Sequence, residues 1–558
     1  MKRSINSSLL FRSFFPLRFV VVGILSCLLV LGFNSKAANA LTIPTALTGT
    51  TFDLTMAYGT TQFFDTGNAT TTGGYNGSML GPTLIMNSGD FVTLNVQNSL
   101  GEETTTHWHG MHVNSSDDGG PHTVIAAGDT WSPDFTVYDT CATFWYHPHL
   151  HEQTHEQVNA GLAGMILIRD DVETAAGLPT SYGEDEFPLI IQDKEFDGSN
   201  QLRRVNFGNV IMVNGTLDPT LEVPAQYVRF RVLNGSSERA YHLGFSDNRN
   251  FYIVGADGGL LEAPVELNRA VMMPAERLDI VLDLGSSQGS TINLVNYATT
   301  LPMGLPGSPT GPGGMNALNM ADTAMLEIVV GAATASPVTS IASSIWTIPD
   351  RPLETEATVT RSIQLTRTGM TFGIDGQSYD SSRMDQVVLK DAVEIWEITS
   401  MVGAHPFHIH DIQFFILDRD GNPPEAREAG KKDTVLVNNE TVRFIAKFER
   451  FTDTEIPYMY HCHILPHEDA GMMAQFIVVD PEEQLIDLTP SSTDITLRWS
   501  KNLGTDVFTL QTSSTVDAAF SAVGTTPTVV DDKNQITYTV DTANRFFRLA
   551  PVTTESGD

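Results

Sequence analysis

The feature that most constrains the fold of this chain is a set of four short histidine clusters that lie far apart in the sequence. Ten of the fifteen histidines fall in HWHG, HPH, HPFHIH and HCHILPH. Each cluster contains a His-x-His pair, and the side chains of an extended strand alternate between its two faces. The two histidines of each pair therefore share a face, which gives eight imidazoles in four pairs: His107 with His109, His147 with His149, His408 with His410, and His461 with His463.

A second group of metal-binding side chains has the opposite alternation. Cys462 must point away from the histidines on both sides of it, and His405 has the opposite parity from the His-x-His pair of its own cluster if that segment is extended. His467 and either Met472 or Met473 follow in the turn after the cysteine. Two imidazoles, one thiolate and a thioether are the ligand set of a blue electron-transfer copper, which zinc would use poorly.

These two groups predict two different metal sites. Eight imidazoles exceed what one four-coordinate structural zinc needs, and they suit a cluster of several copper ions that can bind oxygen. Because Cys462 is bonded through the backbone to a histidine on each side, the chain itself would supply a covalent route for electrons between the two sites.

The remaining thiol and histidines fall outside this pattern. Cys141 lies six residues before His147, so an unbroken strand would place the two roughly 20 Å apart, and we interpret Cys141 as a small buried residue rather than a ligand. Five histidines are interpreted as ordinary polar or core residues: His112, His122, His151, His155 and His242.

Short alternating runs between Gly, Asn, Asp and Pro turns predict an all-β fold. Examples are FVTLNVQNSL, YVRFRVLNGS and AVEIWEITS, whereas long amphipathic helices are scarce. We predict three β-sandwich domains over residues 41–170, 171–345 and 346–483, and a small C-terminal β domain of fibronectin type III character over residues 484–558. The Gly-, Pro- and Met-rich stretch from Leu301 to Met320 predicts a mobile loop late in the second block.

The first forty residues have the pattern of a secretory signal peptide. Basic residues precede the apolar run FVVVGILSCLLVLGF, and the small residues ANA follow it. A retained membrane anchor and a lipoprotein modified at Cys27 are the alternatives, but the run is short for a span and continues past the cysteine. We therefore expect cleavage after Ala40, export to the periplasm or the extracellular space, and no membrane attachment of the mature protein.

Charge and cysteine content narrow the possible functions further. The formal net charge is −34 at pH 7, so nucleic acid is an unfavourable partner. The chain has three cysteines, one of them inside the predicted signal, so disulfide bonds are not its means of stabilisation. The oligomeric state is left open.

All four histidine clusters together resemble the signatures of the multicopper oxidases, the family of laccases, bilirubin oxidases, spore-coat laccases and bacterial cuprous oxidases. The resemblance covers roughly residues 45 to 480, including VNGTLDPTLEV and MPAERLDIVLDL in a middle block without a ligand cluster. It implies three cupredoxin-like Greek-key domains and four copper ions, one of type 1, one of type 2 and two of type 3.

Carried over residue by residue, the resemblance gives each candidate ligand a role. The type 1 site would use His405, Cys462 and His467, with Met472 as the axial ligand because it lies five residues after His467, and Met473 would be packing. The type 2 copper would take His107 and His408. The six type 3 ligands would be His109, His147, His149, His410, His461 and His463.

The resemblance also implies the reaction. A reductant would give single electrons to the type 1 site, and four of them would reduce dioxygen to two waters at the cluster. Acidic residues deliver protons in this family, and Asp118 in DDGGP and Glu468 beside His467 occupy the matching positions.

Three functions remain in competition on the sequence alone. The first is an exported oxidase of phenols, other aromatic compounds or tetrapyrroles. A cuprous oxidase that protects against copper is the second, although a longer Met-rich segment than Leu301–Met320 would be expected for it. The third is a non-enzymatic cupredoxin scaffold of the cell envelope, but scaffolds of this kind lack the ligands that this chain has.

Overall fold

The computed structural model describes residues 39–349, 351–369, 371–480, 486–491, 494–504, 508–513, 519–531, 533–539 and 546–552. The predicted signal peptide lies outside the described residues except for Asn39 and Ala40, which form β1 and pair in parallel with β15. Within the described parts of the chain, no helix combines the length and the apolar character that a membrane crossing requires.

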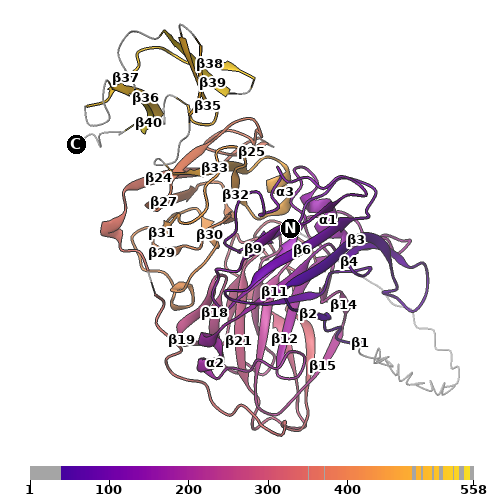
Figure 1. Ribbon diagram of the computed structural model, residues 1–558. Coiled ribbons are helices and arrows are strands. Elements are labelled where there is room, and N and C mark those ends of the chain that lie inside the picture. Colours follow the sequence, from indigo (N-terminus) through magenta and orange to yellow (C-terminus); the bar gives the residue numbers. More distant parts are fainter. Residues whose placement is uncertain are drawn as a thin grey trace, which may run out of the picture. The chain divides into compact units, whose positions relative to one another are not determined.

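Strands make up most of the regular secondary structure of the described chain, which confirms the predicted all-β fold. The first sandwich places one five-stranded sheet against another, and Figure 1 shows its strands in indigo and purple. The sheets are β2 (Ala46–Thr48), β5 (Thr83–Asn87), β11 (Gly164–Arg169), β10 (Ala142–His147) and β7 (His107–His109); and β4 (Thr70–Tyr75), β3 (Thr51–Thr61), β6 (Phe91–Asn98), β8 (Thr130–Trp131) and β9 (Asp134–Thr136).

Strand β6 illustrates how the sequence produces these sheets. Val92, Leu94 and Val96 are buried in the first core, while Phe91, at the start of the strand, is 59% exposed. This is the two-residue period expected of a strand that has one face on the core and one in solvent.

The second sandwich contains the largest apolar cluster of the described chain. Its β12 is buried along its whole length, because the strand has neighbours on both of its faces. The sheets are β1 (Asn39–Ala40), β15 (Pro219–Val223), β23 (Thr323–Val330), β22 (Thr291–Asn296), β17 (Tyr241–Phe245) and β20 (Ala270–Met272); and β14 (Thr216–Leu217), β13 (Val210–Val213), β12 (Glu186–Lys194), β16 (Tyr227–Asn234), β21 (Arg277–Asp283), β18 (Phe251–Ala256) and β19 (Gly259–Leu267).

The third sandwich packs around Trp396 and a group of phenylalanines. Its sheets are β25 (Thr371–Ile374), β24 (Val359–Thr368), β27 (Val393–Ser400), β31 (Thr441–Lys447) and β29 (Phe415–Arg419); and β26 (Gln386–Leu389), β33 (Met473–Val479), β32 (Tyr458–Cys462), β28 (Ala404–Ile409) and β30 (Thr434–Asn438). The three α-helices of the described residues are short: α1 (Thr154–Ala160), α2 (Asp171–Ala176) and α3 (Leu465–Asp469).

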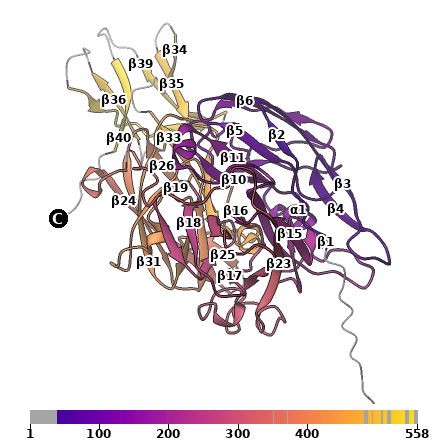
Figure 2. The ribbon, with the colours of Figure 1, turned by 90° about the horizontal axis from the view of Figure 1, so that it is seen from below.

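The C-terminal β domain consists of two small sheets, shown in yellow in Figure 2. They are β34 (Asp487–Pro490), β35 (Asp494–Ser500), β39 (Lys533–Thr539) and β38 (Thr528–Val530); and β37 (Ser521–Ala522), β36 (Phe508–Ser513) and β40 (Phe546–Pro551). Leu497 and Trp499 share one apolar cluster with Ile477 and Val479 of β33, so this domain packs directly on the third sandwich.

The stretch from Leu301 to Met320 contains no strand, in agreement with its turn-rich sequence. The loop is nevertheless anchored, because Leu301 and Leu305 are buried in a cluster with Ala404, the residue before His405. Met303 and Met315 are 81% and 84% exposed.

Candidate metal centre

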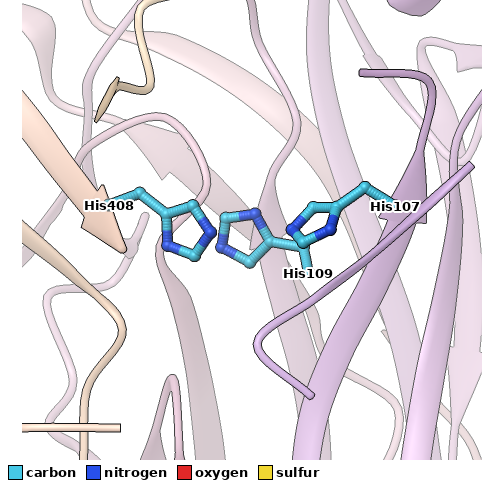
Figure 3. Close-up of side chains that lie close together, drawn as sticks. All are labelled: His107, His109 and His408. Carbon is cyan, nitrogen blue, oxygen red and sulfur yellow. The ribbon is translucent and has the colours of Figure 1, made fainter. Parts of the chain in front are cut away.

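The eight paired histidines meet in one buried space between the first and third sandwiches. Antiparallel pairing of β7 with β10 places His107 opposite His147, and pairing of β28 with β32 places His408 opposite His461. Each of the eight histidines is at most 1% exposed. In Figure 3 the rings of His107 and His109 from β7 point toward the ring of His408 from β28.

Strand alternation accounts for part of this arrangement. Both His107 and His109 lie within β7, whereas His149, His410 and His463 follow the last residue of their strands. These three side chains still reach the common space. His149 is fixed there by its backbone amide, which donates to Thr105 Oγ1 at 2.7 Å.

The imidazoles form three groups whose possible donor atoms all lie within 4.8 Å of one another. They are His107, His109 and His408; His109, His147 and His463; and His149, His410 and His461. Stacking holds the rings between sandwiches, with 3.8 Å between the ring centroids of His107 and His410 and 3.7 Å between those of His109 and His408.

Hydrogen bonds to the protein select which ring nitrogen faces the common space. Nδ1 of His107 and of His408 lies 2.9 Å from a backbone carbonyl oxygen, and the Nε2 atoms of both rings are buried with no partner among the described residues. His109 is reversed, since its Nε2 lies 3.2 Å from Asp433 Oδ1 and its Nδ1 has no described partner. Buried ring nitrogens without partners are what a metal site needs, with the other nitrogen held by the protein.

The electrostatics of the site favour neutral rings. Burial, followed by the neighbouring imidazoles, holds the pKa well below the ordinary histidine value for His109, His408 and His410. Burial likewise lowers the pKa of His149 to about 3, although Glu468 opposes the shift. Neutral imidazole is the form that binds a metal, so the site can accept cations without first losing protons.

Two buried carboxylates hold rings of the group. Asp118 Oδ2 lies 2.7 Å from His410 Nδ1, and Glu468 Oε2 lies 3.2 Å from His461 Nδ1. Burial opposes ionisation of Glu468, but the adjacent His149 and His461 outweigh it and lower its pKa to about 2. Glu468 is therefore a carboxylate at neutral pH.

A second group of donors lies on the other side of β32. His405 Nδ1 is 3.3 Å from Cys462 Sγ, His467 Nδ1 is 3.8 Å from the same sulfur, and the two Nδ1 atoms are 3.3 Å apart. Met472 is fully buried in the same apolar cluster, and its carbonyl accepts from the Cys462 amide at 3.1 Å. Burial raises the pKa of the Cys462 thiol well above its usual value, so a thiolate here calls for a bound cation.

Residues outside the predicted pattern make other contacts. Cys141 is buried in a separate apolar cluster, and its amide donates to Asp170 Oδ2 at 2.9 Å. His112 Nδ1 lies 2.7 Å from Asp411 Oδ1 and His122 Nε2 lies 2.7 Å from Gln475 Oε1. In the described chain, none of His112, His122, His151, His155 and His242 joins a group of donor atoms that could hold a metal.

Sequence reasoning missed Asp433. Its carboxylate contacts His109, and its carbonyl oxygen lies 2.9 Å from His408 Nδ1. Asp433 lies in the sequence KKDTV, directly before β30. No spacing or motif distinguishes it from a charged residue at the protein surface.

Comparisons with known proteins agree with this geometry. Two family models described as multicopper oxidase match residues 56–173 and 350–482. Multicopper oxidase mco of Staphylococcus aureus is 33% identical over 467 residues, which covers 80% of this chain and 94% of that protein. The solved structure of the laccase-like multicopper oxidase CueO from Ochrobactrum sp. is 33% identical with a TM-score of 0.71, covering 79% of this chain and 100% of that one.

The chain is also similar to a protein that is named for cell division rather than for an oxidase activity. Cell division protein FtsP of Xenorhabdus nematophila is 31% identical over 414 residues, which covers 73% of this chain and 84% of that protein.

Cupredoxin-like sandwiches that surround one thiol–imidazole site and one imidazole cluster define a class of copper-binding oxidoreductases. Within that class the chain belongs to the multicopper oxidase family. It is accordingly an enzyme that takes electrons from a reductant and uses dioxygen as their acceptor.

Proposed function

We propose that this protein is an exported oxidase that takes single electrons from phenolic or other aromatic reductants and passes them to dioxygen. The observation that carries the proposal is the completeness of both donor sets, since every predicted imidazole and the Cys462 thiol lie in one of the groups of close donor atoms. Bound copper would supply one-electron redox chemistry at the first site and oxygen reduction at the second.

The grouping of the imidazoles supports a count of four copper ions. Two groups of three match the predicted type 3 ligands, with His109, His147 and His463 in one and His149, His410 and His461 in the other. His107 and His408 remain for a type 2 copper. The type 1 copper would be held by His405, Cys462 and His467, with Met472 as the axial ligand.

The chain around Cys462 provides the connection between the two sites. Its backbone leads in one direction to His461 and in the other to His463, and these two histidines belong to different three-imidazole groups. Electrons that enter at Cys462 therefore have a bonded path of similar length to each side of the cluster.

Proton supply is proposed for the two carboxylates. Glu468 contacts His149 and His461, and Asp118 contacts His107 and His410, so each lies beside rings of the cluster. Both are about 1% exposed. A carboxylate in such a position can take up a proton from water and pass it on to negative charge that develops at the cluster.

The surroundings of His467 support an aromatic reductant. The Phe372 ring stacks on the His467 imidazole at 4.0 Å between centroids, and the Arg367 guanidinium lies 5.0 Å from the same phenyl ring. His467 itself is only half-buried. An aromatic donor can therefore approach the type 1 site across an apolar, cationic surface.

Oxidation of Cu(I) is the second candidate function. The loop that carries the exposed Met303 and Met315 packs through Leu301 and Leu305 against the residue before His405, and Met401 in the preceding turn is 67% exposed. Thioethers are soft ligands that suit Cu(I). The similarity to FtsP keeps a scaffold role as a third possibility, which the complete donor sets argue against.

Oxygen uptake by the copper-loaded mature protein tests these functions together. Cu(I) and a simple phenol are supplied in parallel, with Cys462→Ser as the inactive control and copper per chain measured for both proteins. Faster turnover of the phenol supports the proposal, and a strong preference for Cu(I) selects the second function. No uptake by a protein with four coppers would favour the scaffold.

Export is tested separately. The proposed cleavage after Ala40 requires the mature protein recovered outside the cytoplasm to begin at Leu41. A protein that keeps residues 1–40 in the membrane fraction would contradict it.

A further inference from the structure

The second sandwich supplies no candidate ligand, yet one of its side chains reaches the cluster through Asp433. Asp433 Oδ1 lies 3.2 Å from His109 Nε2 and accepts from Thr434 Oγ1 at 2.9 Å. The Asp433 carbonyl oxygen lies 2.9 Å from His408 Nδ1. One residue thus contacts a histidine of the first sandwich and a histidine of the third.

The Asp433 carboxylate is held by Arg277, the first residue of β21 in the second sandwich. Arg277 Nη1 donates to Asp433 Oδ1 at 2.9 Å, and Nη2 donates to Asp433 Oδ2. Both side chains are fully buried. Among the described residues, Arg277 is the only arginine or lysine that forms an ion pair with Asp433.

The other donors of Arg277 fix the guanidinium itself. Nε donates to the carbonyl of Thr143 in β10 at 2.9 Å, Nη1 to Ala275 at 2.8 Å and Nη2 to Asp257 at 3.1 Å. Arg277 therefore bonds to all three sandwiches at once, with every N–H engaged. A planar guanidinium can do this while it grips a carboxylate with two parallel hydrogen bonds, and a lysine ammonium cannot.

This chain of contacts fixes the tautomer of His109. With the Asp433 carboxylate held in place, the neutral His109 ring donates from Nε2, which leaves Nδ1 free toward His147 and His463. Partners of metal-binding histidines act in this way by fixing the orientation of the ring. A carboxylate free to rotate would lose both the orientation of His109 and the contact with Arg277.

We propose that Arg277 is a positioning residue for the copper cluster, through which the second sandwich takes part in assembling a centre to which it gives no ligand. The inference rests on the proposed ligand role of His109. It assigns Arg277 an effect on the cluster and none on the site of Cys462, which lies entirely in the third sandwich.

The test compares Arg277→Met with Arg231→Met in the full-length protein. Arg231, in β16, is equally buried and is paired with Glu173, Glu186 and Asp279, but none of its hydrogen bonds or ion pairs goes to a candidate ligand among the described residues. Copper per chain, the type 2 electron paramagnetic resonance signal and the near-ultraviolet absorption of the type 3 pair report on the cluster. The blue absorption reports on the type 1 site.

We expect Arg277→Met to keep the blue absorption while the cluster holds copper about 10- to 100-fold more weakly. Arg231→Met should keep both centres, and Arg277→Lys should fall between wild type and Arg277→Met. If Arg277→Met does not fold, Arg277→Lys decides, and a wild-type copper affinity of its cluster overturns the proposal.

Two other results would also overturn it. Equal loss of cluster copper in Arg231→Met would mean that any break in the buried ion pairs has this effect. Unchanged cluster signals in a folded Arg277→Met would overturn the positioning role of Arg277 and leave the proposed function intact. By contrast, a copper-loaded wild type without type 2 and type 3 signals would overturn the proposed function, and this inference with it.

Discussion

The two candidate copper centres lie on opposite sides of one strand, but they are assembled in different ways. His405, Cys462 and His467 all come from the third sandwich and are joined by the pairing of β28 with β32 and a short turn. The imidazole cluster draws four histidines from each of two sandwiches. The first centre therefore depends on the fold of one domain, and the second depends on how domains pack together.

This difference shows where the buried charges are needed. Arg277, Asp257, Asp433 and Lys432 form ion pairs where the second and third sandwiches meet, next to the cluster. Removing one partner of a buried pair costs about 3–5 kcal/mol. The cluster can therefore be weakened from a distance, whereas the single-domain site should respond only to its own surroundings.

Replacing Cys462 should have the largest effect, because this residue serves both centres. Cys462→Ser removes the soft ligand and the proposed electron route, so the blue absorption should vanish and oxygen uptake should fall to background while the cluster still binds copper. Cys141→Ser is the matched control, since Cys141 is equally buried and belongs to neither centre. Blue colour retained in Cys462→Ser would contradict the assignment.

Glu468→Gln should affect the cluster side alone. The amide keeps the shape of the side chain but cannot carry a proton, so oxygen uptake should fall about 10²- to 10⁴-fold. Reduction of the type 1 site by a donor without oxygen should keep its rate. Glu428→Gln, at a buried carboxylate paired with Arg419, is the control. A loss of the anaerobic rate equal to the loss of uptake would refute the proton role.

The pH dependence of the copper-free protein should reveal the buried neutral rings of both centres. Burial lowers the pKa of His149 to about 3 and that of His405 to about 4, so the unfolded chain binds more protons than the folded one below about pH 6.5. Stability should therefore fall as the pH drops from 6.5 toward 4, by several kcal/mol, or about 1.4 kcal/mol per pH unit for each such group.

Glu468 adds a further loss of stability in the same direction, at lower pH. Its pKa is lowered to about 2, so its stabilising contribution is complete above the unfolded value of about 4.5 and disappears as the pH falls to 2. Chemical unfolding of the copper-free protein between pH 7 and pH 3.5 measures both effects. Copper competes with protons for the His149 and His405 rings, so the copper-loaded protein should keep the stability that the copper-free protein loses between pH 6.5 and 4. An equal loss in the copper-loaded protein would contradict the assignment of these rings.

Period-two alternation predicts that the candidate ligands divide into two groups, because neighbouring residues of a strand must face opposite ways. It does not account for His149, His410 and His463, which follow the last residues of their strands. Alternation separates Cys462 from His461, and His405 from His408, onto opposite faces of their strands. The choice of ring nitrogen could not be predicted, since it depends on carbonyls such as that of Asp433, which is distant in sequence from His109. The roles of Arg277 and Asp433 could not be predicted either, because each is a single charged residue whose partner lies 156 positions away in the sequence.

The anchoring of the Leu301–Met320 loop and the packing of the C-terminal domain could not be predicted for the same reason. The residues that decide them are ordinary apolar side chains, Leu301 and Leu305 in one case and Trp499 in the other. Their sequences predict turns and strands correctly, but they carry no information about which distant surface they will cover.

Met472 provides the smallest expected effect and the sharpest separation of the two centres. A thioether ligand stabilises the oxidised type 1 copper, so Met472→Leu should raise the reduction potential of that site without changing the spectra of the cluster. Leucine has a similar volume, and a Leu-for-Met exchange in a core costs less than about 1.5 kcal/mol.

Met473→Leu is the natural control, because Met473 is also buried but lies in β33, where we interpret it as packing. A redox titration of the blue absorption compares the three proteins. If Met473→Leu shifts the potential and Met472→Leu does not, the axial ligand is Met473, and the turn after His467 is one residue longer in the copper-bound protein than the proposed spacing requires.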